Sequence, residues 1–175
     1  DGIADYQDHD NDNDGYSDDT EILTGFNPMD SSSVPPDNDN DFIPDVLDLD
    51  DDNDGFTDDI DTCPRDAGTS SLGLELGCDD YDSDGYSDAT DVFPTESTQW
   101  LDSDEDGYGD NADGFQGDGC TDVVGDSTED RFGCPDADTD GWSDVNDAFP
   151  NEITQHSDTD GDGFGDAING FQGDE

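Results

Sequence analysis

The chain has 175 residues, of which 54 are Asp or Glu and only 2 are Lys or Arg, so its net charge at pH 7 is −52. Only 27% of the residues are hydrophobic, which is too little apolar surface to offset chain entropy against the repulsion of so many like charges. Nucleic acid is excluded as a partner, because no basic patch exists to bind phosphate. Direct membrane insertion is excluded as well, because no apolar run approaches the length of a membrane span.

The dominant feature of the sequence is a twelve-residue pattern, DxDxDGxxDxxD. Its complete copies are residues 10–21, 37–48, 50–61, 80–91, 102–113, 136–147 and 158–169. Carboxylates at positions 1, 3 and 5, a backbone carbonyl at position 7 and an acid at position 12 are the oxygen ligands of a calcium loop. Glycine at position 6 permits the sharp turn that such a loop needs. The pattern therefore predicts multiple calcium ions, at least one for each complete copy.

The predicted ligands are the residues at positions 1, 3, 5, 7, 9 and 12 of each loop, with position 7 contributing its carbonyl oxygen. They are Asp10, Asp12, Asp14, Tyr16, Asp18, Glu21; Asp37, Asp39, Asp41, Ile43, Asp45, Asp48; Asp50, Asp52, Asp54, Phe56, Asp58, Asp61; Asp80, Asp82, Asp84, Tyr86, Asp88, Asp91; Asp102, Asp104, Asp106, Tyr108, Asp110, Asp113; Asp136, Asp138, Asp140, Trp142, Asp144, Asp147; and Asp158, Asp160, Asp162, Phe164, Asp166, Asn169. An eighth, truncated copy contributes Asp1, Asp5 and Asp8. Because the chain begins inside a motif, we expect it to be a segment of a longer polypeptide.

The loops are not identical. Phe42 replaces the glycine of loop 37–48, so this loop departs furthest from the calcium pattern, and Asn169 replaces the closing acid of loop 158–169. Loops 37–48 and 50–61 are separated by a single residue, so the closing acid of one lies beside the opening acid of the next. We expect these two sites to be coupled.

The second half of the chain is a duplication. Residues 80–119 align with residues 136–175 without a gap and share the segments FP, TQ and GFQGD. The predicted domains are an N-terminal calcium-loop array (1–61), two cysteine-flanked insertions (62–79 and 120–135) and two calcium-loop pairs (80–119 and 136–175).

Regular secondary structure should be scarce, because no window shows helical periodicity and Gly or Pro interrupts the chain frequently. The predicted fold is irregular, an elongated array of tandem loops in which calcium ions and disulfides replace a hydrophobic core. The aromatic residues at position 7 are expected to pack between successive loops; a sugar-binding platform is the alternative.

Three segments of the chain are similar to one known repeat family. These are the sequence DDDNDGFTDDIDTCP at residues 50–64, the sequence DNDNDFIPDVLD before it, and the DxFP endings of the duplicated units. In these segments the chain resembles the thrombospondin type 3 repeat. The resemblance covers nearly the whole chain. It implies repeats with almost no regular secondary structure, wrapped around strings of calcium ions and joined by disulfides between neighbouring repeats. An EF-hand is disfavoured, because position 8 is Ser, Thr, Gly or Pro instead of a branched aliphatic residue.

Four cysteines allow three connectivities. We favour sequential pairing, Cys63 with Cys78 and Cys120 with Cys134, which closes each calcium-free insertion. A zinc site is the alternative, but it is disfavoured because no CxxC or paired histidine is present. Paired cysteines are typical of an oxidising compartment, so we expect an extracellular or cell-surface location.

These features favour a calcium-stiffened spacer, stalk, matrix or filament element that either self-associates or binds matrix or surface partners. Calcium storage or mineral binding is one alternative, and an adhesion segment that recognises protein or glycan is another. No nucleophile or general-base constellation is present, so we do not expect an enzyme.

Overall fold

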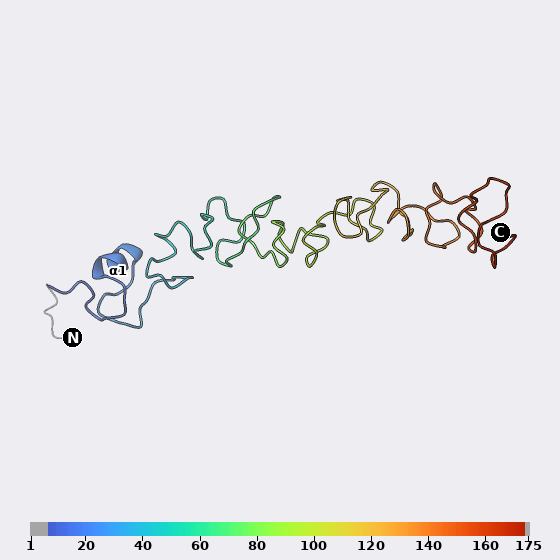
Figure 1. Cartoon of the computed structure of the whole chain (residues 1–175). Helices are drawn as coiled ribbons and strands as arrows, with labels where there is room; N and C mark the ends of the chain where they lie inside the picture. The colour runs from blue at the N-terminus through green and yellow to red at the C-terminus, as the bar shows by residue number, and fades with distance from the viewer. Residues whose placement is uncertain (1–6, 174–175) are drawn as a thin grey trace. The chain divides into compact units, whose positions relative to one another are not determined.

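Nearly the whole chain is irregular loop and turn in the computed structural model, which describes residues 7–173 (Figure 1). In this range the only helix is α1, Asp18–Thr24, and the only β-pairing is an isolated bridge between Gly165 and Gly173. The expected loop-rich fold with little regular secondary structure is thereby confirmed. Among the described residues, no helix is long and apolar enough to cross a membrane.

The chain divides into two compact units, and the boundary between them falls inside loop 80–91. The described residues up to Asp80, together with Gly85–Ser87, belong to the first unit, and Tyr81–Asp84 with the chain from Asp88 onward belongs to the second. The finer division into loop arrays and insertions stays a prediction.

Helix α1 forms the end of the first loop. The Ser17 side chain caps its N-terminus, and Gly25, in the left-handed conformation at φ 89°, ends it by donating its N–H to the Glu21 carbonyl. Ile22 and Leu23 are 65% and 71% exposed, whereas Glu21 is fully buried. The helix therefore buries an acid and leaves its apolar residues in solvent. A seven-residue element is too short to show the periodicity from which a helix is predicted.

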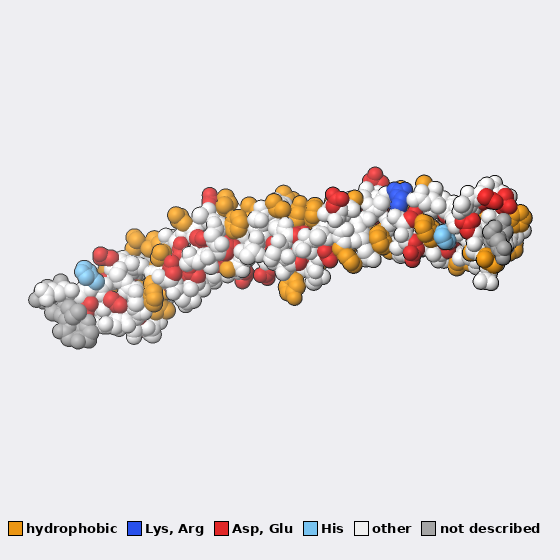
Figure 2. Space-filling model, viewed as in Figure 1, with side chains coloured by type: hydrophobic (Ala, Val, Ile, Leu, Met, Phe, Trp, Pro, Cys, Tyr) orange, Lys and Arg blue, Asp and Glu red, His pale blue; other side chains and the backbone are white. Residues whose placement is uncertain are grey.

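Buried side chains are mostly polar in the part of the chain that the structure describes. Tyr16, Cys78 and Cys134 are the buried hydrophobic residues, whereas Leu74 and Val145 are 93% and 77% exposed. Hydrophobic side chains are scattered over the visible surface among the acids (Figure 2). Acid clusters and disulfides thus stand in place of a hydrophobic core, as the sequence predicts.

Two disulfides, Cys63–Cys78 and Cys120–Cys134, close the insertions in the sequential pairing. They close segments with sequence separations of 15 and 14 residues. A cross-link over a loop of this length stabilises a fold by about 3 kcal/mol.

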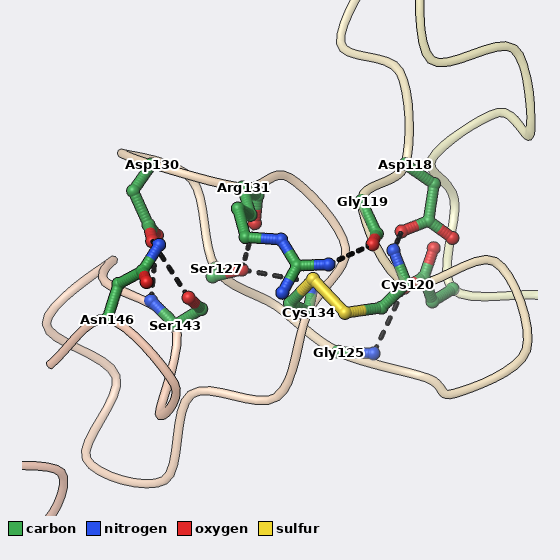
Figure 3. The surroundings of a disulfide bond; sticks show 11 residues. Asp118, Gly119, Cys120, Gly125, Ser127, Asp130, Arg131, Cys134, Ser143 and Asn146 are labelled. Atoms are coloured by element: carbon green, nitrogen blue, oxygen red, sulfur yellow. Dashed lines mark hydrogen bonds between the residues drawn. A yellow bond between two sulfur atoms is a disulfide. The ribbon is translucent and has the colours of Figure 1, made fainter.

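The two insertions fold in the same way around a buried serine. In the first, the Ser70 hydroxyl accepts the Cys78 N–H (2.9 Å) and donates to a backbone carbonyl of the insertion (2.8 Å). In the second, the Ser127 hydroxyl accepts the Cys134 N–H (3.0 Å) and donates to the Arg131 carbonyl (Figure 3). Each serine is fully buried with its hydrogen bonds made, so each fixes the path of the chain beside a disulfide.

A glycine five residues after the first cysteine docks each insertion onto the loop before it. The Gly68 N–H donates to Asp54 and the Gly125 N–H donates to Asp106, both at 3.0 Å and both to the acid at loop position 5. A Cβ atom added at Gly125 would lie 2.0 Å from the carbonyl carbon of Cys134. Only glycine fits this close approach of two backbone segments.

The far side of each insertion docks onto the loop that follows. The N–H groups of Thr128 and Glu129 both donate to the Gly141 carbonyl, at 2.8 and 2.9 Å. Two consecutive N–H groups of the first insertion donate in the same way to the Gly85 carbonyl, both at 2.8 Å. Each insertion therefore ties together the loop before it and the position-6 residue of the loop after it.

A buried glutamine organises the segment that follows each FP sequence in the duplicated units. Gln99, 2% exposed, donates its amide to the carbonyls of Asn111 (2.9 Å) and Phe115 (3.1 Å) and accepts the Asn111 N–H (3.0 Å). Gln155, 1% exposed, makes the same three bonds to Ala167 and Phe171. The shared TQ segment of the two copies is therefore structural.

Three aromatic residues at position 7 pack against rings of other segments, and the pair of Tyr16 with Phe42 joins two successive loops as expected. These ring pairs are Tyr16 with Phe42 at 5.7 Å, Tyr108 with Phe132 at 5.7 Å, and Trp142 with His156 at 4.5 Å in a parallel stack. Such offset and edge contacts add stabilisation beyond the area that they bury.

Candidate metal centres

All seven loops share one backbone conformation. Position 4 is left-handed in every loop, with φ between 57° and 76°, and position 6 is left-handed with φ between 72° and 107°. Even Phe42, which replaces the glycine, adopts φ 72°. Its N–H still donates to the Asp37 carboxylate at 3.0 Å, as the glycine does in the other loops. Loop 37–48 therefore keeps the common geometry in spite of the substitution.

The carboxylate at position 1 holds this turn. In loop 102–113, the two Asp102 oxygens accept the N–H groups of Glu105 (2.7 Å) and Gly107 (2.8 Å). Asp10 accepts the N–H groups of Asn13 and Gly15 in the same way. Hydrogen bonding at position 1 therefore brings positions 1, 3 and 5 around a common centre.

The acids at positions 1, 3 and 5 converge as predicted. One carboxylate oxygen from each lies within 4.8 Å of the others in five groups, with two further groups of this kind among the described residues. The five groups are Asp10, Asp12, Asp14; Asp37, Asp39, Asp41; Asp50, Asp52, Asp54; Asp80, Asp82, Asp84; and Asp102, Asp104, Asp106. Each group could hold a metal ion.

At position 3 the two carboxylate oxygens have different surroundings. In Asp52, Asp104 and Asp138, one oxygen accepts the N–H two residues further on, at 3.1 to 3.2 Å. The second oxygen is buried and accepts no hydrogen bond from the described residues. Burial raises the pKa of all three carboxyls, and their neighbouring aspartates raise it further.

The carbonyl at position 7 is available as a ligand. Within residues 7–173, no backbone N–H donates to the position-7 carbonyls of six loops, which belong to Tyr16, Ile43, Phe56, Tyr108, Trp142 and Phe164. Because no backbone N–H occupies them, these oxygens fit the carbonyl ligand that the motif predicts.

Position 9, which we expected to supply a ligand, fastens the loop at its other end. In every loop one of its carboxylate oxygens accepts the N–H of position 2, as Asp110 does from Ser103 at 2.9 Å. In loop 158–169 the Thr159 N–H and hydroxyl both donate to Asp166, and these bonds lower the pKa of that carboxyl. The position-9 carboxylate therefore holds the two ends of the loop together by hydrogen bonding to position 2. Its role as a metal ligand stays a prediction.

The acid at position 12 returns to the centre in several loops. Glu21 reaches it from helix α1, and neither of its buried carboxylate oxygens accepts a hydrogen bond within the described residues. Burial, together with the charges of Asp12 and Asp14, raises the Glu21 pKa to about 7. Asp61 follows the same plan in loop 50–61, with one oxygen bonded to the Cys63 N–H (2.7 Å) and the other unpartnered.

Two positions differ from the expectation. Asp113 and Asn169, the predicted closing residues of loops 102–113 and 158–169, are both exposed. Conversely Asp118, which the twelve-residue pattern does not include, is 2% exposed. The predicted ligands Asp1 and Asp5 lie outside the described residues, and the described Asp8 accepts the Asp10 N–H at 3.3 Å.

Arg65 provides positive charge beside two loops of the first unit. It pairs with Asp45 (3.1 Å) and Asp51 (3.5 Å), which lie at position 9 of one loop and position 2 of the next. The pKa of Asp51 is nevertheless raised by burial and by neighbouring aspartates. This pair is not predictable from sequence spacing, because the arginine comes from the insertion and not from a loop.

The donor set fits a hard cation. Buried carboxylate oxygens without a hydrogen-bond donor in the described range occur on Asp12, Asp14, Glu21, Asp50, Asp51, Asp52, Asp61, Asp104, Asp118 and Asp138. Leaving an ionised oxygen buried and unpaired is costly, so such oxygens point to a bound positive charge. The disulfides leave no free cysteine among the described residues, so thiolate does not enter the donor set.

No protein-family model matches the chain, and no curated protein shows significant similarity to it. The class of protein is therefore defined by its own geometry. The chain is a loop-rich, disulfide-bonded array of repeated Asp-x-Asp-x-Asp groups that could bind metal, consistent with a calcium-binding repeat.

Proposed function

We propose that this chain is an extracellular calcium-binding structural array of the thrombospondin type 3 kind. The observation that carries the proposal is the set of buried carboxylate oxygens, named above, that accept no hydrogen bond from residues 7–173 and belong mainly to positions 3, 5 and 12. In a core-less chain of net charge −52, a cation at each loop is the physical means by which these oxygens become stable.

Calcium is the cation that this donor set suits best. Its six to eight ligands are carboxylate, carbonyl and water oxygens held in flexible geometry. Each loop offers carboxylates at several positions, and in six loops the position-7 carbonyl accepts no backbone N–H from the described residues. Magnesium is a poorer match because it keeps several waters and demands a stricter octahedron, and zinc prefers nitrogen and sulfur ligands.

Bound calcium would supply the charge that neutralises each carboxylate group. The chain's own residues do the rest: position 1 fixes the turn, position 9 fastens its far end, and the insertions link neighbouring loops through Gly68 and Gly125. Such a linked array would be stiff when calcium is bound. This supports the role of spacer, stalk, matrix or filament element.

The proposed location follows from the same chemistry. Disulfides persist in oxidising compartments, and extracellular calcium modules work at roughly 10⁻⁴ to 10⁻³ M calcium. Calcium storage, mineral binding and adhesion use the same acidic surface and are the alternatives. The experiment below separates storage from a structural role.

Calcium titration after chelation tests the proposal. We expect the loop amides to gain hydrogen-exchange protection as calcium is added, because the acids repel one another until an ion is bound. Asp138→Asn removes a charge from a buried, unpartnered carboxylate oxygen and should lower the number of bound ions. Asp122→Asn, at an exposed acid outside the loops, is the matched control and should not.

Protection that survives excess chelator would overturn the proposal. Calcium that binds in high number and exchanges without any gain in protection would instead favour storage.

A further inference from the structure

We infer that Asp118, and not Asp113, is the closing calcium ligand of loop 102–113. This inference rests on the proposed calcium-binding function and extends it to a residue five positions beyond the twelve-residue pattern. It follows from the hydrogen bonds that Asp118 makes, its burial and its neighbours, all within the second unit.

The backbone places Asp118 where other loops place their closing acid. In loops 50–61 and 136–147 the N–H of the closing residue, Asp61 or Asp147, donates to the carbonyl of position 8 at 2.9 Å. In loop 102–113 the N–H that reaches the position-8 carbonyl, that of Gly109, comes from Asp118 at 2.8 Å. The Asp113 N–H donates instead to the Asn111 side chain at 3.2 Å.

The Asp118 carboxylate also has the surroundings of a closing acid. Its Oδ1 accepts the Cys120 N–H at 2.6 Å (Figure 3). Asp61 accepts the Cys63 N–H in the same way, at 2.7 Å. Its Oδ2 is buried and accepts no hydrogen bond from the described residues. The side chain is 2% exposed, whereas Asp113 is exposed. An ionised oxygen that is buried and unpaired needs a positive charge beside it.

The Asp118 carboxylate lies beside the acids of loop 102–113. A Cβ atom added at Gly133 would lie 2.4 Å from Asp118 Oδ1 and 3.0 Å from Asp106 Oδ2, so the two carboxylates flank one glycine. Burial raises the pKa of Asp118, and the charges of Asp106 and Asp104 raise it further. Those two acids are positions 5 and 3 of loop 102–113.

Buried Gln99 explains the shift in position. Its amide holds the carbonyls of Asn111 and Phe115 and accepts the Asn111 N–H, so residues 111–115 wrap around this side chain and away from the centre. The Phe115 N–H, which would otherwise be free to bond Asp113, donates to the Thr98 hydroxyl at 2.7 Å. The chain returns to the loop only at Asp118.

The duplicated copy agrees with this reading. Gln155 makes the same three bonds there, and the residue aligned with Asp113 is Asn169, which has no carboxylate to offer. The residue aligned with Asp118 is Asp174, which lies outside the described residues. A closing acid is therefore dispensable at position 12 of this loop type.

The test compares Asp118→Asn with Asp113→Asn in the whole chain, titrated with calcium alone. Asparagine keeps the Oδ1 acceptor for the Cys120 N–H and removes only the charge. Binding at loop 102–113 is followed through the Gly107 amide by NMR, and bound ions are counted by native mass spectrometry. We expect Asp118→Asn to weaken this site by about tenfold or more, because ligand charge tunes affinity. Asp113→Asn should bind as the unaltered chain does.

If Asp113→Asn loses affinity at this loop while Asp118→Asn keeps it, the inference is wrong. If Asp118→Asn disturbs the fold, Asp118→Glu and Asp118→Gln replace it: the glutamate variant should bind more tightly, and equal binding would overturn the assignment. Failure of the proposed function looks different, since the unaltered chain would then bind calcium at none of its loops.

Discussion

The residue at position 4 of each loop adopts a left-handed backbone conformation, although its type differs from loop to loop. Three loops have asparagine there and one has glycine, the residues that tolerate the left-handed region best, whereas Thr139 holds φ 63° with a branched side chain. Left-handed backbone costs a residue such as threonine about 1–2 kcal/mol. The loop hydrogen bonds must offset this cost.

Thr139→Asn should therefore stabilise loop 136–147 by about 1 kcal/mol, because asparagine adopts the left-handed conformation at lower cost. Chemical unfolding of the chain in saturating calcium measures the difference. The reverse change at an exposed equivalent position, Asn13→Thr at φ 62°, should destabilise loop 10–21 by a similar amount. Equal stability of Thr139→Asn and the unaltered chain would show that the loop relaxes this strain elsewhere.

Under the proposed function, we expect Glu21 to make calcium binding at the first loop depend on pH. Its pKa in the folded, metal-free chain is raised from 4.5 to about 7 by burial and by neighbouring aspartates. The folded state therefore holds a proton that the unfolded chain releases. The resulting stabilisation of the metal-free fold is fully present below about pH 4.5 and is lost as the pH rises through about 7.

We accordingly expect calcium to displace this proton. Adding calcium in weakly buffered solution should release more protons at pH 6 than at pH 8, and Glu21→Gln should reduce the release at pH 6. A pH-stat titration measures it. The same release from Glu21→Gln as from the unaltered chain would assign the proton to other acids.

The disulfide insertions and the buried glutamines are the elements that position the loops. Each insertion bonds to the loop before it and the loop after it, and each buried glutamine side chain makes hydrogen bonds to three backbone groups. Polar hydrogen bonds thus take the positioning role that apolar packing has in a conventional domain. An unsatisfied buried group costs about 1–3 kcal/mol, so such contacts are sensitive to single substitutions.

Gln99→Leu keeps the volume of this side chain but leaves two carbonyls and one N–H unpaired. We expect it to lower the free energy of unfolding by about 3 kcal/mol and to loosen residues 111–118. Hydrogen exchange and chemical unfolding in calcium provide the measurement. The exposed Gln116→Ala, with the same residue type in the same segment, should change stability by less than about 0.5 kcal/mol.

At the scale of the whole molecule, the net charge of −52 and the tandem arrangement of the loops determine the expected behaviour. Loops that contact mainly their sequence neighbours form quasi-one-dimensional arrays, and a core-less chain has no apolar centre to draw distant loops together. For these reasons the sequence predicts an elongated array.

Small-angle scattering tests that prediction. A compact domain of this length would have a radius of gyration of about 16 Å and an unfolded chain about 44 Å. In millimolar calcium the value should lie clearly above the compact figure, with a rod-like profile. Chelation at low salt should abolish that profile and expand the chain, because uncompensated carboxylates repel over about a Debye length. A calcium-loaded value near 16 Å would contradict the spacer role.

The sequence by itself determined the irregular fold, the convergence of acids at positions 1, 3 and 5, and the disulfide partners. These features are local: ligand spacing and turn residues act over twelve positions, and each disulfide closes one short insertion. Only the tertiary structure decided which acid closes loop 102–113. Asp113 has the right sequence spacing, but the buried Gln99, twelve residues before Asn111, turns that segment away and brings Asp118 to the centre. Contacts between segments so far apart leave no periodic signal in the chain, because they depend on which side chains the folded backbone buries together.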